Sequence, residues 1–143
     1  MNKAIALGAD NGYMDKVETT IKSVCAHNDS IKFYVFNDDL PSEWFRVMNK
    51  RLGKINSQIV NAKISDNHLR KYHLPMAHLS YAAYFRFFIP EVVEEEKVLY
   101  LDSDIIVDGD LTDLFEIDLG DSPLAAVRDD LQRTNFNSGV MLI

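Results

Sequence analysis

Two aspartates separated by one residue, in Asp102-Ser103-Asp104, have the types and spacing that most directly suggest chemistry. Close carboxylates repel one another when unpaired, and a divalent cation relieves that repulsion. Oxygen ligands of this kind suit Mg²⁺ or Mn²⁺, whose remaining coordination positions are filled by water and substrate phosphate. The alternative is a polar turn with solvated acids. The motif alone does not decide between these two interpretations.

The residues before the motif favour the metal site. Residues 98–101 are a continuous apolar run, which is typical of a strand buried on both faces. In open α/β sheets, ligands lie in the crevice outside the carboxyl ends of the strands, and Asp102 and Asp104 fall at such an end. Residues 105–107, Ile-Ile-Val, predict another short strand.

Strands and helices alternate in the first half of the chain. Residues 3–9 and 31–36 are strand-like apolar runs that turn-forming residues end, and residues 58–62 predict a third strand. Two helices separate them, with apolar side chains at helical spacing: Met14, Val17, Ile21, Val24 and Cys25, then Phe45, Met48, Leu52 and Ile55. This order predicts an α/β domain with a mostly parallel sheet flanked by helices.

The second half is less regular. Ser65 is a candidate cap for a short helix that Pro75 breaks, and residues 79–89 predict an aromatic-rich helix that Pro90 stops. Residues 124–127 and 139–143 predict the last strands. The final run stays apolar up to its last residue, without a cap, turn or polar tail, so we expect the chain to be a fragment.

Composition disfavours several classes of function. The 143 residues fit one domain, and the net charge of −7 argues against nucleic acid, whose phosphates attract clustered Lys and Arg. Cys25 is the single cysteine, so no internal disulfide can form. The sequence shows no signal peptide and no transmembrane segment, and we expect a cytoplasmic protein. The four histidines lack metal-ligand spacing, although His73 and His78 could border a ligand site.

Several motifs together resemble glycosyltransferase family 8. The segment from Tyr100 to Asp104, followed by Asp-Leu-Thr-Asp-Leu-Phe at 110–115, is similar to the family signature. Residues 136–143 resemble its downstream Asn-x-Gly-Val motif, and Ala9-Asp10 resembles the end of its first strand. The resemblance covers nearly the whole chain. It implies a Rossmann-like GT-A fold in which residues 1–143 are the nucleotide-sugar-binding part of a single domain, truncated at its C-terminus.

The resemblance implies an activity as well. The enzyme would transfer a hexose from UDP-Gal or UDP-Glc to a glycan or glycoconjugate acceptor with retention of configuration, using Mn²⁺ or Mg²⁺ at Asp102 and Asp104. The family's third metal ligand, a histidine, its diphosphate-binding lysine and its acceptor site lie beyond the end of this chain. We therefore expect a UDP-sugar binder that transfers sugar poorly or not at all, and the alternative is an inactive binding or interaction domain. Peripheral attachment to a membrane would depend on the missing part, and the sequence predicts no oligomeric state.

Roles for single residues follow from the same resemblance. Ala9 and Asp10 would contact the uracil, whereas a helix N-cap is the alternative for Asp10. Tyr13 would stack on the base, and the alternative is that it packs on the following helix. Gly12 stands where the family often has asparagine. Arg86 would reach the donor, with a structural ion pair to Asp102 or Asp129 as the alternative.

The remaining assignments concern the donor sugar. Asp129 and Asn137 would orient it as the catalytic residues, with Asp130 as a competitor for the first role. Ser103 and Gly139 would border the donor, since glycine permits close backbone approach, while Asn-Ser-Gly at 137–139 could equally be a turn.

Other classes of enzyme fit less well. A phosphohydrolase of the haloacid-dehalogenase pattern would use Asp102 as nucleophile. That pattern needs Thr or Val at the position of Ile106, and its motif normally follows the first strand, whereas Asp102 follows about the fourth. A response-regulator receiver needs its acids at early strand ends, and these acids follow about the fourth strand.

Overall fold

A single six-stranded sheet organises the molecule. The computed structural model describes residues 3–65, 81–131 and 134–143, and the strand order is β3-β2-β1-β4-β6-β5. The first half of the chain contains β1 (Lys3–Gly8), η1 (Asn11–Tyr13), α1 (Met14–Cys25), β2 (Ile31–Asn37), α2 (Ser42–Leu52), η2 (Gly53–Ile55) and β3 (Gln58–Lys63). The second half contains η3 (Tyr81–Phe88), α4 (Ile89–Val92), β4 (Val98–Leu101), α5 (Thr112–Phe115), β5 (Ala125–Arg128) and β6 (Phe136–Leu142).

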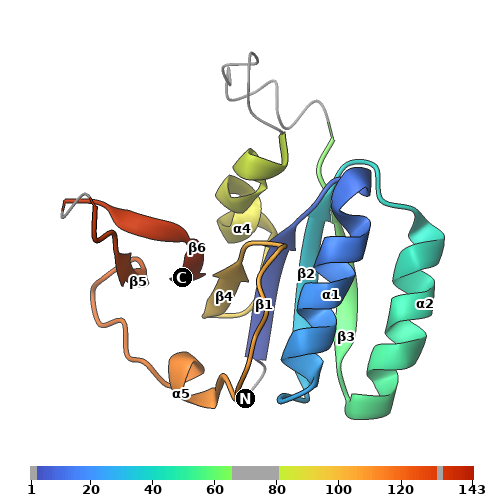
Figure 1. The fold of residues 1–143 in the computed structure, drawn as a ribbon, viewed down its shortest axis with the longest axis horizontal. Coiled ribbons are helices and arrows are strands. Elements are labelled where there is room, and N and C mark those ends of the chain that lie inside the picture. The colour runs from blue at the N-terminus through green and yellow to red at the C-terminus, as the bar shows by residue number, and fades with distance from the viewer. Residues whose placement is uncertain (1–2, 66–80, 132–133) are drawn as a thin grey trace.

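The strand directions confirm a mixed sheet that is parallel over its first four strands. β1 runs parallel to β2 and β4, and β2 runs parallel to β3. β6 is antiparallel to both β4 and β5, and it reaches past the sheet edge as a long, bent strand (Figure 1). The predicted α/β class is therefore correct, and the antiparallel insertion lies at the C-terminal end of the described chain.

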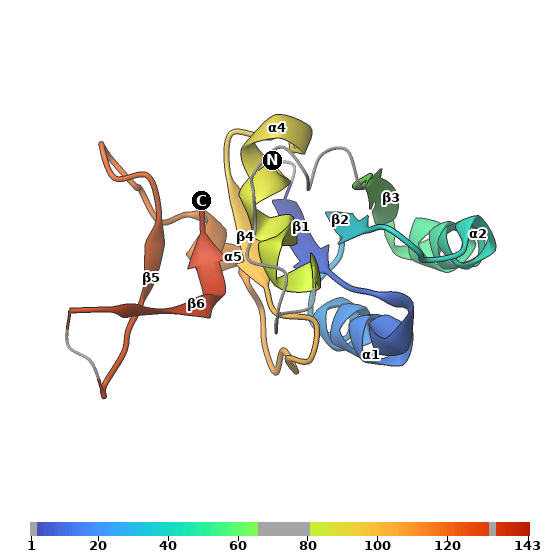
Figure 2. The same ribbon diagram turned by 90° about the horizontal axis from the view of Figure 1, so that it is seen from above.

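Helices cover both faces of the sheet, which creates two cores (Figure 2). On one face, alternate strand residues pack against α1 and α2, and the core includes Ile5, Leu7, Phe33, Val35, Val17, Ile21, Phe45 and Met48. On the other face, η3 and α4 contribute Phe85, Phe88 and Ile89, which pack on Ala6, Phe36 and Tyr100. This alternation follows from the period of two in a strand, which sends successive side chains to opposite faces.

Two predicted elements differ from the structure. Residues 105–107 are not a strand, because Val107 instead donates its backbone N–H to Ser23 Oγ on α1, at 2.9 Å. Pro90 does not stop a helix. It lies in the first turn of α4, where its missing N–H costs no hydrogen bond.

The rest of the predicted aromatic helix is a 3-10 helix, η3, and its expected start at residue 79 lies outside the described residues, as do Pro75, His68, His73 and His78. Among the described residues, no helix is long and apolar enough to cross a membrane.

Candidate functional site

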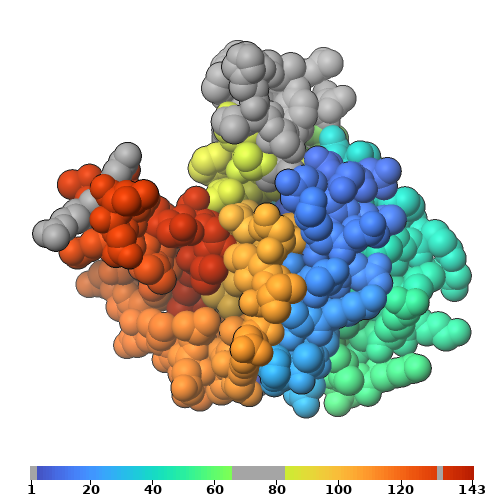
Figure 3. Space-filling model, in the orientation of Figure 1, coloured from blue at the N-terminus to red at the C-terminus, as the bar shows by residue number. Residues whose placement is uncertain are grey.

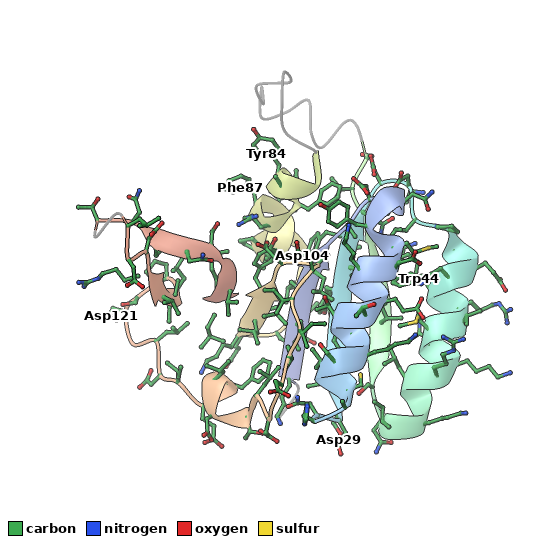
Figure 4. All side chains as sticks on the ribbon, viewed as in Figure 1. Asp29, Trp44, Tyr84, Phe87, Asp104 and Asp121 are labelled. Atoms are coloured by element: carbon green, nitrogen blue, oxygen red, sulfur yellow. The ribbon has the colours of Figure 1, made fainter. Side chains whose placement is uncertain are left out.

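A cleft of about 230 Å³ opens at the carboxyl ends of β1 and β4. The two strands are neighbours in parallel register, with Ala6 opposite Tyr100, so the chain leaves both at the same edge of the sheet. In Figure 4, Asp104 lies at this edge, below η3. Most of the predicted site residues line the cleft, together with Gly8, Ala83 and Tyr100; they are Ala9, Asp10, Tyr13, Arg86, Asp102, Ser103 and Asp104.

The middle residue of the acidic motif fixes its position. Ser103 is buried, and its hydroxyl donates a short hydrogen bond to the carbonyl of Gly8 at the end of β1. Its own carbonyl accepts a hydrogen bond from Thr20 Oγ1 on α1, at 3.0 Å. The inward serine is thus bound to two other elements, while Asp102 and Asp104 on either side face the cleft.

Helix α1 also holds the segment that follows the motif. Asn28, in the turn that follows this helix, accepts a hydrogen bond from Leu111 N and donates to the carbonyl of Gly109. With the bond from Val107 to Ser23, these contacts bind residues 103–111 to one polar edge of α1. Buried backbone groups need partners of this kind where no strand supplies them.

Arg86, Tyr100 and Asp102 form a compact group on one side of the cleft. The Tyr100 hydroxyl donates to Asp102 Oδ1 at 2.9 Å, and Arg86 Nη2 lies 3.6 Å from the same oxygen. The guanidinium carbon lies 4.8 Å from the centre of the Tyr100 ring, a cation–π distance. Arg86 also donates from Nη1 to the Ser138 carbonyl at 3.0 Å. Of the two ion-pair partners considered for Arg86, Asp102 and Asp129, the arginine therefore pairs with Asp102.

The electrostatics of this group keep Tyr100 a hydrogen-bond donor. Burial raises the pKa of its phenol, the Arg86 guanidinium opposes that rise, and the Asp102 carboxylate adds to it. The net direction is upward from an ordinary value of 10, so the phenol keeps its proton at neutral pH.

Gly139 of β6 brings a second strand against Asp102. Asp102 N donates to the Gly139 carbonyl at 2.8 Å. A methyl group at position 139 would lie 2.7 Å from Asp102 Oδ2 and 3.1 Å from Asn137 Oδ1. The predicted close approach at this glycine is present, and the segment from 137 to 139 is part of β6 rather than a free turn.

Asp10 lies on the opposite side of the cleft and forms the cap of η1. Its Oδ1 accepts a hydrogen bond from Tyr13 N at 3.0 Å, as the N-cap interpretation predicts. Asp39, which follows β2, accepts a hydrogen bond from Asn11 N at 2.8 Å. The exposed Tyr13 ring carries Lys16 Nζ at 4.4 Å from its centre. The loop after β1 is thus tied down locally and presents an aromatic ring at the cleft.

Asp129 lies in a different cavity. This second cavity, of about 470 Å³, is lined by Val127, Arg128, Asp129, Asp130, Asn137 and Val140. Asp129 caps a turn there by accepting a hydrogen bond from Leu131 N. Asn137 Oδ1 accepts a hydrogen bond from Gly139 N at 2.8 Å and, like Asp102 Oδ2, lies close to the Cβ position of Gly139. Asp129 and the competing Asp130 both line this cavity, so the structure leaves that choice open.

Tyr100 lines the cleft as well, although the sequence predicted no role for it. The sequence feature that could have indicated its place is the alternation of side chains along strand β4. A side chain two residues before Asp102 leaves the strand on the same face as Asp102, and η3 with Arg86 covers that face.

The sheet, with its one antiparallel insertion, has the GT-A fold of glycosyltransferases. Solved structures support the fold. The chain matches the glycosyltransferase GlyE of Streptococcus pneumoniae TIGR4 with a TM-score of 0.84 at 41% identity, over 100% of this chain and 34% of that one. It matches the galactosyltransferase LgtC, solved with donor and acceptor sugar analogues, with a TM-score of 0.78 at 29% identity, over 98% of this chain and 57% of that one.

Sequence comparison gives the family. The model of glycosyl transferase family 8 matches residues 4–143, and the chain belongs to that family. Glycosyltransferase GlyB of Streptococcus pneumoniae serotype 4 (strain ATCC BAA-334 / TIGR4) is 58% identical over 99% of this chain. The chain spans 36% of the length of GlyB, so it corresponds to about a third of that relative.

Proposed function

We propose that residues 1–143 are the nucleotide-sugar-binding part of a single GT-A domain whose complete form is a metal-dependent, retaining hexosyltransferase. The donor would be UDP-Gal or UDP-Glc, and the acceptor a glycan or glycoconjugate. One observation carries the proposal, namely that Asp10, Arg86, Asp102 and Asp104 line one cleft at the carboxyl ends of β1 and β4. In open α/β sheets, nucleotides bind at such strand ends.

The donor set in the cleft fits a hard divalent cation. Asp102 and Asp104 both line the cleft with carboxylate oxygens, and the Asp102 side chain is 42% exposed. Such oxygens suit Mn²⁺ or Mg²⁺, and diphosphate and water commonly complete the shell. In the described part of the chain, no group of three His, Cys, Asp or Glu side chains is placed to hold a metal.

Different residues around the cleft would contact different parts of the nucleotide-sugar donor. Ala9, Asp10 and Tyr13 at the end of β1 would receive the nucleoside, with the exposed Tyr13 ring as a stacking surface. Ser103 and Gly139 would set the backbone close to the diphosphate. Arg86 is positioned by Ser138 and Tyr100 to place its positive charge beside Asp102, where it would meet a phosphate or sugar hydroxyl.

Asp129 and Asn137 would orient the sugar from the second cavity, and the Asn137 side chain lies, with Asp102, beside the Cβ position of Gly139. A bound Mn²⁺ or Mg²⁺ supplies Lewis-acid neutralisation of the charge that develops on UDP as it leaves. The protein's part is to hold these groups in place before the reaction, which is a main source of electrostatic catalysis. A cytoplasmic location remains a prediction.

The test replaces one carboxylate at a time in the full-length protein. We expect Asp102→Asn and Asp104→Asn each to reduce metal-dependent hydrolysis of UDP-Gal or UDP-Glc by about a hundredfold. Asp121→Asn is the matched control, because it removes the same charge at an exposed site that Figure 4 shows far from Asp104.

Three outcomes separate the alternatives. Loss of hydrolysis in the two cleft variants alone supports the transferase. Tight binding of UDP with Mn²⁺ by calorimetry, without turnover in the wild type, indicates a binding domain that lacks activity. Equal activity in all three variants, with no requirement for added metal, would overturn the metal-dependent mechanism.

A further inference from the structure

We propose that Tyr100 is a positioning residue that occupies one oxygen of Asp102 and so makes this carboxylate a one-oxygen ligand. The proposal rests on the function proposed above, because it concerns how the cleft presents Asp102 to a divalent cation. Tyr100 itself would touch neither metal nor substrate. It would act through the carboxylate.

The two oxygens of Asp102 have different surroundings. Oδ1 accepts the hydrogen bond from the Tyr100 hydroxyl at 2.9 Å and lies 3.6 Å from Arg86 Nη2. Oδ2 lies against Gly139 of β6, only 2.7 Å from the position that a Cβ would take there. A donor and a cation therefore both lie on the Oδ1 side. A carboxylate oxygen engaged in this way is a poorer ligand for a second cation.

Tyr100 is built to hold this arrangement. The residue is 4% exposed and packs in the core between the sheet and η3, so the phenol has little freedom to leave. The Arg86 guanidinium lies against the ring, 4.8 Å from its centre, and bonds to the Ser138 carbonyl. The carboxylate is thus fixed from two sides by groups that are themselves fixed. Outer partners of metal ligands commonly act in this way.

The consequence is a preference among cations. Mg²⁺ and Mn²⁺ accept a carboxylate through one oxygen in a tight octahedral shell, whereas Ca²⁺ takes six to eight oxygens and readily binds both oxygens of one carboxylate. By occupying Oδ1, Tyr100 would withhold from Ca²⁺ the second oxygen that it uses. The same contact would preorganise the single oxygen that Mg²⁺ and Mn²⁺ need.

Tyr100→Phe tests the role, because it removes one oxygen atom and leaves the ring beneath Arg86. Tyr34→Phe is the matched control. Tyr34 is also a buried strand tyrosine whose hydroxyl donates to a carboxylate, Glu95 Oε2 at 2.8 Å, and it does not line the cleft. Dissociation constants for Mn²⁺, Mg²⁺ and Ca²⁺ are measured by calorimetry on the full-length protein with UDP present, alongside the thermal midpoint of each variant.

We expect Tyr100→Phe to bind Mn²⁺ and Mg²⁺ about tenfold more weakly than the wild type. Its affinity for Ca²⁺ should fall less or rise, so that the ratio of the Mg²⁺ to the Ca²⁺ dissociation constant increases severalfold. Tyr34→Phe should leave all three constants unchanged. If Tyr100 had only a structural role, the variant would bind all three cations more weakly by the same factor, together with a lower thermal midpoint. The ratio of the dissociation constants therefore separates a positioning role from a structural one.

The failures are distinguishable. A wild-type protein that binds no divalent cation with UDP would overturn the proposed function, and the positioning role with it. A wild type that binds Mn²⁺ while Tyr100→Phe keeps the wild-type ratio of Mg²⁺ to Ca²⁺ affinity would overturn the positioning role alone.

Discussion

At the scale of single residues, the lack of a side chain at Gly139 is as important for the position of Asp102 as the charged residues around it. Gly139 lies against Asp102, and any Cβ there would come within 2.7 Å of Oδ2 and 3.4 Å of the carboxyl carbon. Contacts below 3.0 Å force a shift. The carboxylate would have to turn away, and it would then pull on Tyr100 and Arg86 as well.

We therefore expect Gly139→Ala to weaken binding of Mn²⁺ with UDP by about tenfold, a loss typical of a displaced ligand shell. Gly109→Ala is the control, since a Cβ at that loop glycine would meet nothing within 4 Å. Calorimetric titration of both variants measures the effect. Equal affinities in the two would show that Asp102 tolerates the methyl group and that the contact is not part of the site.

Single residues differ in how far the sequence could place them. Asp102 and Asp104 were predictable, because they stand beside a buried strand whose direction sets where they emerge. Asp10 serves as the N-cap that its type and place suggested. Arg86 was predictable as a paired charge with Asp102 or Asp129 as its partner. The choice between the two was not predictable, because it depends on which face of the sheet η3 covers. Tyr100 was read only as part of a motif.

At the scale of elements, α1 does more than cover the sheet. Thr20 is 1% exposed and donates its hydroxyl to the Ser103 carbonyl, which lies in the middle of the acidic motif. Together with Ser23 on the same helix and Asn28 just beyond its end, Thr20 forms a polar edge that faces the loop after β4. The helix thus holds the loop after β4 by hydrogen bonds where strand pairing is absent.

Thr20→Val keeps the shape of the side chain and removes the donor, which leaves a buried carbonyl without this partner. We expect a loss of about 1–3 kcal/mol in the free energy of unfolding. Thr19→Val is the control, because Thr19 is exposed and bonds only to Asp15 within the same helix turn, so its effect should stay within about 0.5 kcal/mol. Urea unfolding measures both, and a Thr20→Ser variant should recover most of the loss.

The same loop explains why one element was wrongly predicted. Residues 105–107 have the composition of a strand, yet they do not join the described sheet, and two of their three side chains pack against the core instead. Val107 is buried against the core on the α1 face, Ile105 packs beside it, and Ile106 is 64% exposed. The composition of such a segment predicts that its side chains are buried, but it does not predict whether a neighbouring strand is available for pairing.

At the scale of the whole molecule, one ion-pair network on the face of η3 ties the sheet to the turn before β4. Lys32 Nζ lies 2.9 Å from Glu95, which also accepts the Tyr34 hydroxyl. Burial raises the pKa of Glu95, but the hydrogen bonds from Lys32 and Tyr34 outweigh it and hold that pKa below 4.5. A carboxyl whose pKa is depressed by folding stabilises the fold above its unfolded pKa, and this contribution disappears as the pH falls through the folded pKa.

Glu95→Gln should therefore flatten the acid limb of stability. We expect the variant to lose less free energy of unfolding than the wild type between about pH 5 and pH 3, and to be less stable than the wild type at pH 7. Glu94→Gln is the control, since that side chain is 85% exposed and 3.5 Å from Lys32. Urea unfolding across this pH range gives the comparison. Parallel curves for the wild type and Glu95→Gln would contradict the assignment.

The whole sheet was only partly readable from the sequence. The alternation of strands and helices as far as β3 predicted that β1, β2 and β3 run parallel. Parallel neighbours need crossover connections, and α1 and α2 supply them. The insertion of β6 between β4 and β5 was not readable. An apolar run such as residues 139–143 predicts a buried strand, but its direction and neighbours depend on contacts far away in the chain. Figure 3 shows the result, with the orange-red β5 and β6 end projecting beside the yellow-green surface of η3.

The pairing of β4 with β6 also sets an order of events during synthesis. Asp102 leaves the ribosome well before Gly139, whose carbonyl accepts the Asp102 N–H, and before Ile143, which bonds in both directions with Val98. At about 5–20 residues per second, the interval lasts on the order of a few seconds. During that time the nascent acidic motif can be held by β1 and α1 but not by β6. Asp102, on one side of the cleft, therefore gains the partner of its backbone N–H only when the strand that carries Gly139 has been made.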